Sequence, residues 1–298
     1  MFQFLEMIPL FLGLALAPAL PGVEMEPLPP PVVPIVTAAP EETPQVTPPA
    51  ETEDPSPTEE PQPTPSPDPE ETGNSLYILM YHDFVREGDP CGPWTMTDTR
   101  FREDLQWLSD HGYTTVLPSE VIAGDPLPEK AVLLSLDDGY ASNYQIAAPI
   151  LEEFQAKAVI SLIVERRDSG YPNAMTWDMC RELLGSGRIE FGSHTYNAHE
   201  ESQWVQRVGN ETQEEYEARI FPDIRKSIDR IEEELGTKVQ YFAYPQGRSD
   251  PWSDEFIQSH FEMTVTSEPT VADLSHGLYK LPRITVYMDI PLSRFLPE

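Results

Sequence analysis

From Leu76 onward, the chain alternates short apolar runs with longer stretches in which apolar residues recur at helical spacing. Phe101, Leu105 and Leu108 stand at positions i, i+4 and i+7, which is the spacing of one helix face. This alternation is typical of βα units and predicts an α/β protein with a mainly parallel sheet. The predicted strands are the runs 76–82, 113–117, 131–137, 158–164, 189–194, 239–244, 262–266 and 280–286.

A second helical face is formed by Ile224, Ile228, Ile231 and Leu235. Apolar residues at this spacing predict a long helix that packs one side against the sheet. Thr176 stands at a position where its hydroxyl can cap the first turn of another helix. Further helices are expected over 143–156, 176–185 and 252–260.

The charge of the chain is strongly acidic and unevenly distributed. Its 298 residues include 51 Asp and Glu against 19 Lys and Arg, giving a formal net charge of −32. This excess of acids argues against a nucleic-acid partner, because affinity for phosphates comes mainly from basic side chains. Residues 1–75 hold 13 of the acids and no base, so the domain 76–298 carries −19. At about 223 residues, that domain has the size of one α/β barrel.

Proline and acidic residues dominate the segment 24–75. Residues 24–73 contain 16 of the 33 prolines and 12 acidic residues, and the segment has no aromatic side chain. Such a composition cannot bury enough apolar surface to offset the entropy of ordering, so we expect a disordered Pro/Glu/Thr-rich linker. Proline steps and charge repulsion favour an extended form. A proline-rich docking ligand is the alternative interpretation.

The N-terminal segment 1–23 has the features of an export signal. Residues 5–23 form an apolar run with small residues near its end, and Ala17 and Ala19 resemble a cleavage site. A basic segment before the run is missing, so a cleaved signal peptide and an uncleaved membrane anchor are both open. We expect an extracellular or cell-surface protein whose only membrane contact is this segment. A soluble core helix is disfavoured by three prolines.

Cys91 and Cys180 are the only cysteines. Two cysteines are too few for a disulfide framework, a thiolate zinc finger or an iron–sulfur cluster. In an exported domain they can pair, and a buried free thiol is equally compatible with the sequence.

Several predicted strands end in residues that can do chemistry. These residues occupy positions 81–83 (Tyr-His-Asp), 137–139 (Asp-Asp-Gly), 193–195 (Ser-His-Thr) and 244–245 (Tyr-Pro). In α/β barrels the active site is built from loops at the carboxyl ends of the strands. The sequence therefore predicts that these distant segments converge at one site.

The spacing of the histidines does not by itself predict a metal site. His194 and His199 are five residues apart, which places them on one face of neither an ideal helix nor a strand. Both can reach one ion only from an irregular loop. Taken alone, the pair is better explained by a strand-end histidine and a surface histidine, and Asp137-Asp138-Gly139 is better explained by an acidic turn.

Three segments in order, SLDDGY (135–140), SHTYNAH (193–199) and FAYPQG (242–247), resemble the polysaccharide deacetylases, carbohydrate esterases that share the NodB homology domain. The resemblance covers nearly all of 76–298. Within the family the chain is most similar to the branch of the poly-β-1,6-N-acetylglucosamine deacetylases, because it also carries LMYHDF, MTWDMCRELLGSG and LPRITV. The resemblance implies a distorted (β/α)7-type barrel with a metal site at its strand ends.

The resemblance also implies the ligands of a divalent cation. Asp138, His194 and His199 match the metal-binding positions, and this branch shares the longer spacing between the two histidines. Two imidazoles and one carboxylate suit a catalytic site with open coordination positions. Zinc is the expected ion, and cobalt or nickel fits the same ligands.

By the same resemblance, Asp137 is the general base that accepts a proton from the metal-bound water. His82 is the candidate general acid, because the early Tyr-His motif of this branch brings a histidine into the site. An imidazole with an ordinary pKa near 6.5 can pass a proton to the departing amine. The last histidine, His276, lacks the apolar strand that precedes the acid of other family members.

The chain departs from the family pattern in its FAYPQG segment. Ala243 stands where many members have an arginine that orients the base, and Arg283 is the candidate to replace it. Gln246 stands in place of a tyrosine, but its backbone N–H can still donate to an oxyanion. Tyr244 and Trp177 are candidates for a hydrophobic wall against the sugar, with core packing as the alternative.

We therefore expect a metal-dependent hydrolase of linear amides that removes N-acetyl groups from an N-acetylglucosamine polysaccharide, either an exopolysaccharide or cell-wall peptidoglycan. A monomer is expected. An O-acetyl esterase acting on acetylated xylan or a similar glycan is the nearest alternative. A glycan-binding module without catalysis is a third interpretation, although all the expected catalytic residues are present.

Overall fold

The computed structural model describes residues 74–124, 126–200 and 204–298. The predicted N-terminal segment 1–23 lies outside the described residues, as does the predicted linker up to position 73. Ser75, expected at the end of the linker, instead begins the first strand. Within the described ranges, no helix combines the length and the apolar character needed to cross a membrane.

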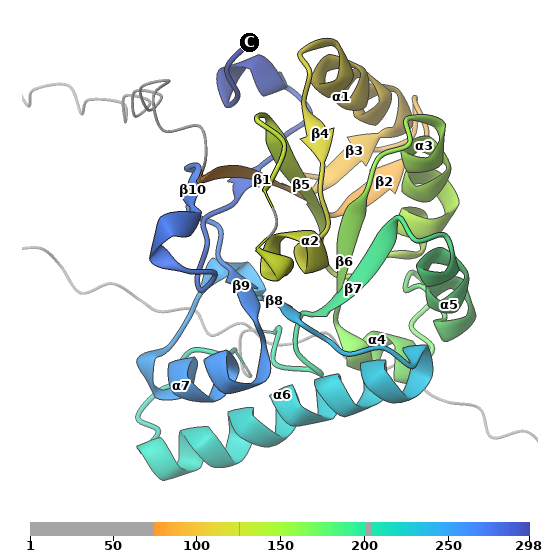
Figure 1. Ribbon diagram of the computed structural model, residues 1–298. Helices are drawn as coiled ribbons and strands as arrows, with labels where there is room; N and C mark the ends of the chain where they lie inside the picture. The colour runs from red at the N-terminus through yellow and green to blue at the C-terminus, as the bar shows by residue number, and fades with distance from the viewer. Residues whose placement is uncertain (1–73, 125, 201–203) are drawn as a thin grey trace, which may run out of the picture. The chain divides into compact units, whose positions relative to one another are not determined.

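Parallel strands form a curled central sheet (Figure 1) in the order β1, β5, β6, β7, β8, β9. β11 pairs in parallel with the other side of β1, and Leu281, shortly before β11, bridges Val265 of β9. The succession of neighbours thus returns to β1, which confirms the predicted distorted seven-stranded barrel. The bounds are β1 Ser75–Tyr81, β5 Ala131–Leu136, β6 Ala158–Leu162, β7 Ile189–Ser193, β8 Tyr241–Ala243, β9 Met263–Val265 and β11 Ile284–Thr285.

Four short strands lie beside this ring. β4 (Thr114–Thr115) extends the sheet next to β5, and β10 (Ala272–Asp273) pairs antiparallel with the start of β1. β2 (Asp83–Val85) and β3 (Thr95–Thr97) form a separate parallel pair. Because β2 follows β1 after a single residue, this pair lies at the carboxyl end of the barrel.

The strands have two apolar faces, as expected for parallel strands covered by helices. On β5, Leu134 and Leu136 pack in the large cluster that also holds the helix residues, while Leu133 packs in a second, smaller cluster. Because side chains alternate along a strand, Leu133, Ser135 and Asp137 share one face. That face changes from apolar to polar toward the carboxyl end, where the functional residues lie.

Helices cover the outer face of the sheet (Figure 1), and the predicted cap at Thr176 is confirmed. The side chain of Thr97 accepts the N–H of Arg100 at the start of α1, and Thr176 accepts that of Met179 at the start of α5. The predicted face of Phe101, Leu105 and Leu108 is buried. The helix bounds are α1 Asp98–Asp110, α2 Pro118–Ala123, α3 Ala148–Glu153, α4 Val164–Asp168, α5 Trp177–Gly185, α6 Gln213–Leu235 and α7 Pro251–His260.

The longest helix, α6, packs against α4, α5 and α7 (Figure 1). It begins with a capping box in which Thr212 and Glu215 satisfy each other's backbone N–H groups, and it ends at Gly236 in the left-handed conformation. Ile224, Ile231 and Leu235 of the predicted face are buried.

The sequence-based prediction differs from the structure at short elements. The predicted helix 143–156 begins as a π-helical turn, Asn143–Ala147, before α3. Pro149 supplies no N–H to the helix at this junction. The last predicted strand, 280–286, is reduced to two residues, and β2, β3, β10, α2 and α4 were not predicted. Elements this short contain too few residues for a periodic pattern. Three 3₁₀ turns complete the fold: Pro245–Gly247, Leu274–His276 and Leu292–Arg294.

Cys91 is exposed and Cys180 is buried in α5, and both are free thiols. Burial raises the pKa of the Cys180 thiol to about 12. Of the two possibilities left open by the sequence, the structure shows the buried free thiol.

Candidate active site

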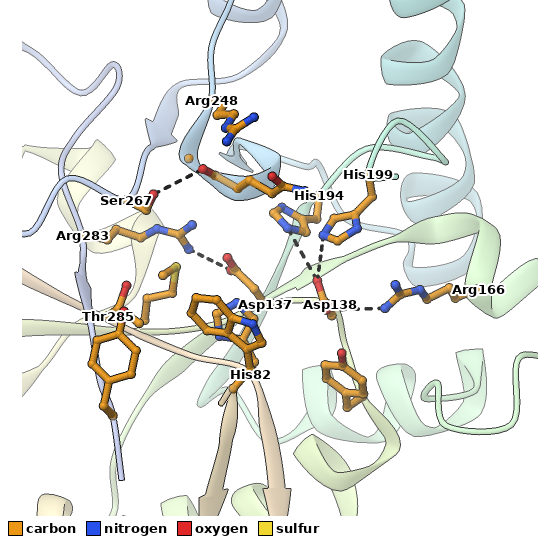
Figure 2. Close-up of a pocket in the computed structure, with 16 residues that line it drawn as sticks. His82, Asp137, Asp138, Arg166, His194, His199, Arg248, Ser267, Arg283 and Thr285 are labelled. Atoms are coloured by element: carbon orange, nitrogen blue, oxygen red, sulfur yellow. Dashed lines mark hydrogen bonds and ion pairs between the residues drawn. The ribbon is translucent and has the colours of Figure 1, made fainter. Parts of the chain in front are cut away.

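A cavity of about 530 Å³ lies at the carboxyl ends of the barrel strands (Figure 2). Parallel strands end at the same edge of a sheet, so residues from distant motifs meet here. Of the predicted site residues, those that line the cavity are His82, Asp137, Asp138, His194, His199, Gln246 and Arg283.

Asp138, His194 and His199 form one compact cluster, with potential ligand atoms all within 4.8 Å of one another. Nε2 of His194 is 3.6 Å from Oδ1 of Asp138, and Nε2 of His199 is 3.4 Å from the same oxygen. Both imidazoles point toward this carboxylate (Figure 2). Three potential ligands thus converge on one point at the edge of the cavity.

The chemistry of this cluster fits a divalent cation. Nδ1 of His194 lies 2.7 Å from the carbonyl oxygen of Ala243, which assigns the proton to Nδ1 and leaves the lone pair of Nε2 facing Asp138. Burial lowers the pKa of His194 to about 4, so the ring is neutral near pH 7. Oδ1 of Asp138 is buried and has no hydrogen-bond partner within the described structure. A buried anionic oxygen facing two imidazole nitrogens is a typical cation ligand set.

The carboxylate of Asp138 is ionised. Burial by itself raises the pKa of an acid, but His194 and His199 outweigh this effect and hold the pKa of Asp138 below its ordinary value. Arg166 of α4 forms an ion pair with the same carboxylate, with Nη1 3.4 Å from Oδ2. No sequence motif had marked Arg166 as part of the site.

Left-handed backbone conformations occur at both ligand-bearing turns. Asp138 has φ = 69° and Thr195, directly after His194, has φ = 73°. Such conformations cost energy for residues other than glycine and persist only where the surroundings enforce them. Gly139 also has a positive φ, and a Cβ there would lie 1.9 Å from Nη2 of Arg167. The turn therefore requires glycine at 139 for close approach of this arginine.

The loop that carries His199 is irregular, as the five-residue spacing of the histidines required. Both carboxylate oxygens of Asp223, on α6, accept backbone N–H groups of this loop: Tyr196 at 2.9 Å and Asn197 at 2.8 Å. One helix side chain thus fixes the course of the chain between the two histidines.

Asp137 is buried and paired with Arg283. Nη1 of Arg283 donates to Oδ1 of Asp137 at 2.8 Å, and the hydroxyl of Ser135 also donates to this oxygen at 3.3 Å. Burial opposes ionisation, but Arg283 and His194 more than compensate and hold the pKa of Asp137 well below its ordinary range. Arg283 is itself fixed by Thr266, whose carbonyl accepts its Nε at 2.7 Å.

His82 lines the cavity at the end of β1, and the centroid of its ring is 5.0 Å from that of Trp94. Burial lowers the pKa of His82, while the nearby carboxylates of Asp137 and Asp138 act in the opposite direction. The net shift is downward, so the free imidazole is neutral near pH 7.

Gln246 occupies the turn after β8 and also has a left-handed backbone, with φ = 55°. The neighbouring Gly247 is held against Ser267, where a Cβ would lie 2.6 Å from the backbone nitrogen. This tight contact leaves no room for a side chain at 247 and sets the course of the Gln246 turn along the cavity wall.

The structure does not bring Tyr244 and Trp177 to the cavity. Tyr244 has no exposed surface and packs edge-on against Phe242, with ring centroids 5.0 Å apart. The Nε1 of Trp177 donates to Asp168 at 3.1 Å, away from the cavity-lining residues. The expectation of a sugar wall at these two positions is corrected, because both rings are engaged in packing within the fold.

The aromatic side chains that do line the cavity are Trp94, Tyr140 and Tyr287. Tyr140 is the last residue of the motif SLDDGY, whereas Trp94 and Tyr287 stand outside the motifs. Trp94 lies in a segment between two strands that the sequence did not predict. His276, set aside as a general acid, is 84% exposed and pairs with Asp273, so it does not contribute to the cavity.

Comparison with known proteins agrees with this fold. The family model described as polysaccharide deacetylase matches residues 124–266. A Bacillus subtilis (strain 168) protein named for the polysaccharide deacetylases, YxkH, is 30% identical over 228 residues, which are 74% of each chain. A solved de-N-acetylase from Aggregatibacter actinomycetemcomitans superimposes with a TM-score of 0.65 at 25% identity, covering 75% of this chain and all of that one.

The poly-β-1,6-N-acetyl-D-glucosamine N-deacetylase of Escherichia coli (strain K12) is 26% identical over 259 residues. The match covers 76% of this chain but only 38% of that enzyme. The barrel carries an Asp-His-His cluster that could hold a metal ion. The chain belongs to the polysaccharide deacetylase family, as the sequence motifs had indicated.

Proposed function

We propose that this protein is a metal-dependent de-N-acetylase of a polysaccharide that contains N-acetylglucosamine. The observation that carries the proposal is the position of the ionised Asp137 in the same cavity as the cluster of Asp138, His194 and His199. Hydrolysis of an unreactive amide requires an activated water, a base and a proton donor. This cavity contains candidates for each.

Asp138, His194 and His199 would hold the cation, for which zinc is the first candidate and cobalt or nickel the alternatives. When bound there, such an ion lowers the pKa of water and polarises the acetyl carbonyl. The neutral state of His194 and the unpartnered oxygen of Asp138 support this assignment.

Asp137 is the proposed general base. Because its pKa is held low, the carboxylate is ionised over the whole neutral range and can accept a proton from the attacking water. Arg283 binds one carboxylate oxygen, Oδ1. The charge and orientation of the base are thus both fixed before substrate binds.

His82 is the proposed proton donor to the departing amine. The ring is neutral in the free enzyme, so it must first receive a proton, and the carboxylates of Asp137 and Asp138 favour its protonated form. Gln246, on the cavity wall, is the proposed source of a backbone N–H for the oxyanion. Arg283 acts through Asp137 and is a positioning residue.

The substrate assignment is supported by relatives and by charge. Several relatives, including one from Staphylococcus epidermidis of which this chain covers 80%, are named poly-β-1,6-N-acetyl-D-glucosamine N-deacetylases. The charge of −19 on residues 76–298 disfavours an anionic polymer and not a neutral N-acetylglucosamine chain or its cationic product. With the apolar segment 1–23, this supports an exported enzyme acting on a surface polysaccharide.

The test is release of acetate from a panel of acetylated glycans: β-1,6- and β-1,4-linked N-acetylglucosamine oligomers, peptidoglycan and acetylated xylan. We expect acetate from an N-acetylglucosamine oligomer, loss of activity on chelation and recovery with zinc. Activity that survives complete removal of metal would overturn the proposal. Release from xylan alone would instead establish the O-acetyl esterase.

The acid role of His82 has its own test, because ester cleavage needs less protonation of the leaving group than amide cleavage. His82→Ala should reduce turnover of the amide far more than turnover of an activated acetate ester. Equal losses on both substrates would reject the role.

A further inference from the structure

Two large aromatic side chains are exposed within the cavity. Trp94 is 52% exposed and Tyr287 is 37% exposed, and both line the cavity. The other exposed large aromatics among the described residues, Tyr171 and Tyr279, do not line it. Exposed aromatic surface gathered at one place on a protein is a frequent mark of a binding site.

These rings continue the surface of His82. The ring centroids of His82 and Trp94 are 5.0 Å apart, and those of Trp94 and Tyr287 are 6.2 Å apart. The three rings come from segments that follow β1, precede β3 and follow β11. Since β1 and β11 are parallel neighbours, their carboxyl ends lie together. His82 and Thr285 lie on the opposite side of Asp138 from Arg166 (Figure 2).

The backbone that carries Tyr287 is held by a single guanidinium. Arg100, on α1, donates to the carbonyl oxygens of Tyr287, Met288 and Ile290 at 3.3, 2.5 and 2.7 Å. Its Nε also donates to the buried Asp104 at 3.0 Å. An arginine with three carbonyl partners and one carboxylate partner fixes this segment although 187 residues separate Arg100 from Tyr287.

We infer that Trp94 and Tyr287 form a platform for a pyranose ring of the polymer on the side of the leaving amine, and that Arg100 is the residue that positions it. The inference rests on the proposed function. If His82 hands its proton to the amine, the sugar that bears this amine must lie beside His82, and the platform begins there. Pyranose rings have apolar C–H faces that pack on aromatic rings, and ligand sites commonly combine such surface with a few polar groups.

The test compares a polymer substrate with one that has no sugar. Acetate release is measured from a β-1,6-linked and a β-1,4-linked N-acetylglucosamine pentamer, and from 2,2,2-trifluoroethyl acetate. Trp94→Ala and Tyr287→Ala should each raise KM for the accepted pentamer about three- to tenfold, the range expected for loss of one aromatic contact. Activity on the small ester should fall less than kcat/KM for the pentamer, because the ester has no sugar ring to contact the platform. Tyr279→Ala, an exposed tyrosine outside the cavity, is the matched control and should change neither.

Arg100→Met tests the positioning role. Like Tyr287→Ala, it should raise KM for the pentamer. In a protein that already carries Tyr287→Ala it should raise KM little further, because both changes remove the Tyr287 ring from its position in the platform. Additive effects would overturn the role of Arg100. Trp94→Phe, which keeps an aromatic face, should restore most of the affinity lost in Trp94→Ala.

A binding measurement separates this inference from the proposed function. Calorimetric affinity for both pentamers is measured with Asp137→Asn, and again with Trp94→Ala added to it. A platform predicts weaker binding of at least one pentamer in the double variant. Unchanged KM and unchanged affinity would overturn the inference even if the enzyme is active. Failure of the wild type to release acetate from either pentamer would instead overturn the proposed function, and the binding result would still decide the platform.

Discussion

Two buried arginines contact the segment of the adjacent Asp137 and Asp138, and they do so in different ways. Arg283 binds the side chain of Asp137 through an ion pair of 2.8 Å. Arg167 contacts no carboxylate among the described residues and instead donates to the backbone carbonyls of Asp138, Gly139 and Ile163. One arginine therefore sets the charge of a side chain, and the other sets the shape of a turn.

The pKa values of the two arginines reflect this difference. Burial disfavours the charged form of both arginines, but Asp137 compensates and the pKa of Arg283 is raised. For Arg167, burial dominates and lowers the pKa to about 10. A buried cation without a carboxylate partner is costly, so its retention indicates a structural demand on the turn. That demand is the left-handed backbone of Asp138, the proposed metal ligand.

The largest effects on activity are expected from neutralising each of the two carboxylates. Asp137→Asn and Asp138→Asn should each lower kcat/KM on the accepted N-acetylglucosamine oligomer, the first by removing the base and the second by removing a metal ligand. For Asp137→Asn the loss should be about 10²–10⁴, the range for loss of an acid–base group. Steady-state kinetics without and with added zinc gives the measurement. Added zinc should restore part of the activity of Asp138→Asn and none of that of Asp137→Asn. Equal recovery of the two variants on addition of zinc would contradict the separate roles of Asp137 and Asp138.

Arg283→Met should have the next largest effect. It leaves Asp137 buried without its partner, which typically costs about 3–5 kcal/mol in unfolding free energy. The pKa of Asp137 is depressed by Arg283, so loss of the arginine raises it and moves the acidic limb of the kcat/KM profile to higher pH. Denaturant titration and a pH–rate profile measure the two effects. An unmoved acidic limb would show that Arg283 does not act through Asp137.

Arg167→Met should weaken metal binding rather than the base. Loss of groups that orient metal ligands typically reduces metal affinity by about 10- to 100-fold. The acidic limb of the pH profile should remain where it is in the wild type, because Arg167 does not contact the carboxylate of Asp137. Zinc affinity is measured by competition with a chelator. Arg167→Lys serves as the control, because lysine keeps the positive charge but lacks the planar guanidinium that donates to several carbonyl oxygens. A shifted acidic limb with normal zinc affinity would reverse the assignment of the two arginines.

The smallest expected effect concerns His194 in the metal-free protein. Burial lowers its folded-state pKa to about 4, below the ordinary value of 6.5. The unfolded chain therefore binds more protons between these values, and the contribution of His194 to stability falls as pH decreases from 6.5 toward 4. The midpoint of thermal unfolding should fall less over this range in His194→Asn than in the wild type. Equal slopes would show that His194 is not buried neutral.

The sequence predicted the residues that carry the chemistry of the site better than the residues that hold them in place. His82, Asp137, His194 and Gln246 follow strands, and parallel strands bring their carboxyl ends to one edge, so the strand pattern was enough to gather them. Arg283 was selected through the resemblance, as the replacement for the arginine that is missing at position 243. Arg167 could not be predicted, because its role depends on the approach of α4 to the Asp138 turn.

The platform of Trp94 and Tyr287 shows the same limit. Both rings reach the cavity through contacts between segments far apart in the chain, and no local period marks them. Trp177 was misassigned for the converse reason. It lies inside a resembling motif, but its place at the first turn of α5 directs it to Asp168. A motif indicates residue type and order, whereas packing decides which side of a helix faces the site.

The most direct test of the account is the zinc content and zinc affinity of the purified protein and its two carboxylate variants. We predict one zinc ion per chain in the wild type and in Asp137→Asn, and a loss of zinc from Asp138→Asn. Elemental analysis after dialysis, with chelator competition, gives both quantities. Loss of zinc from Asp137→Asn with retention in Asp138→Asn would contradict the division of roles between the two neighbouring carboxylates.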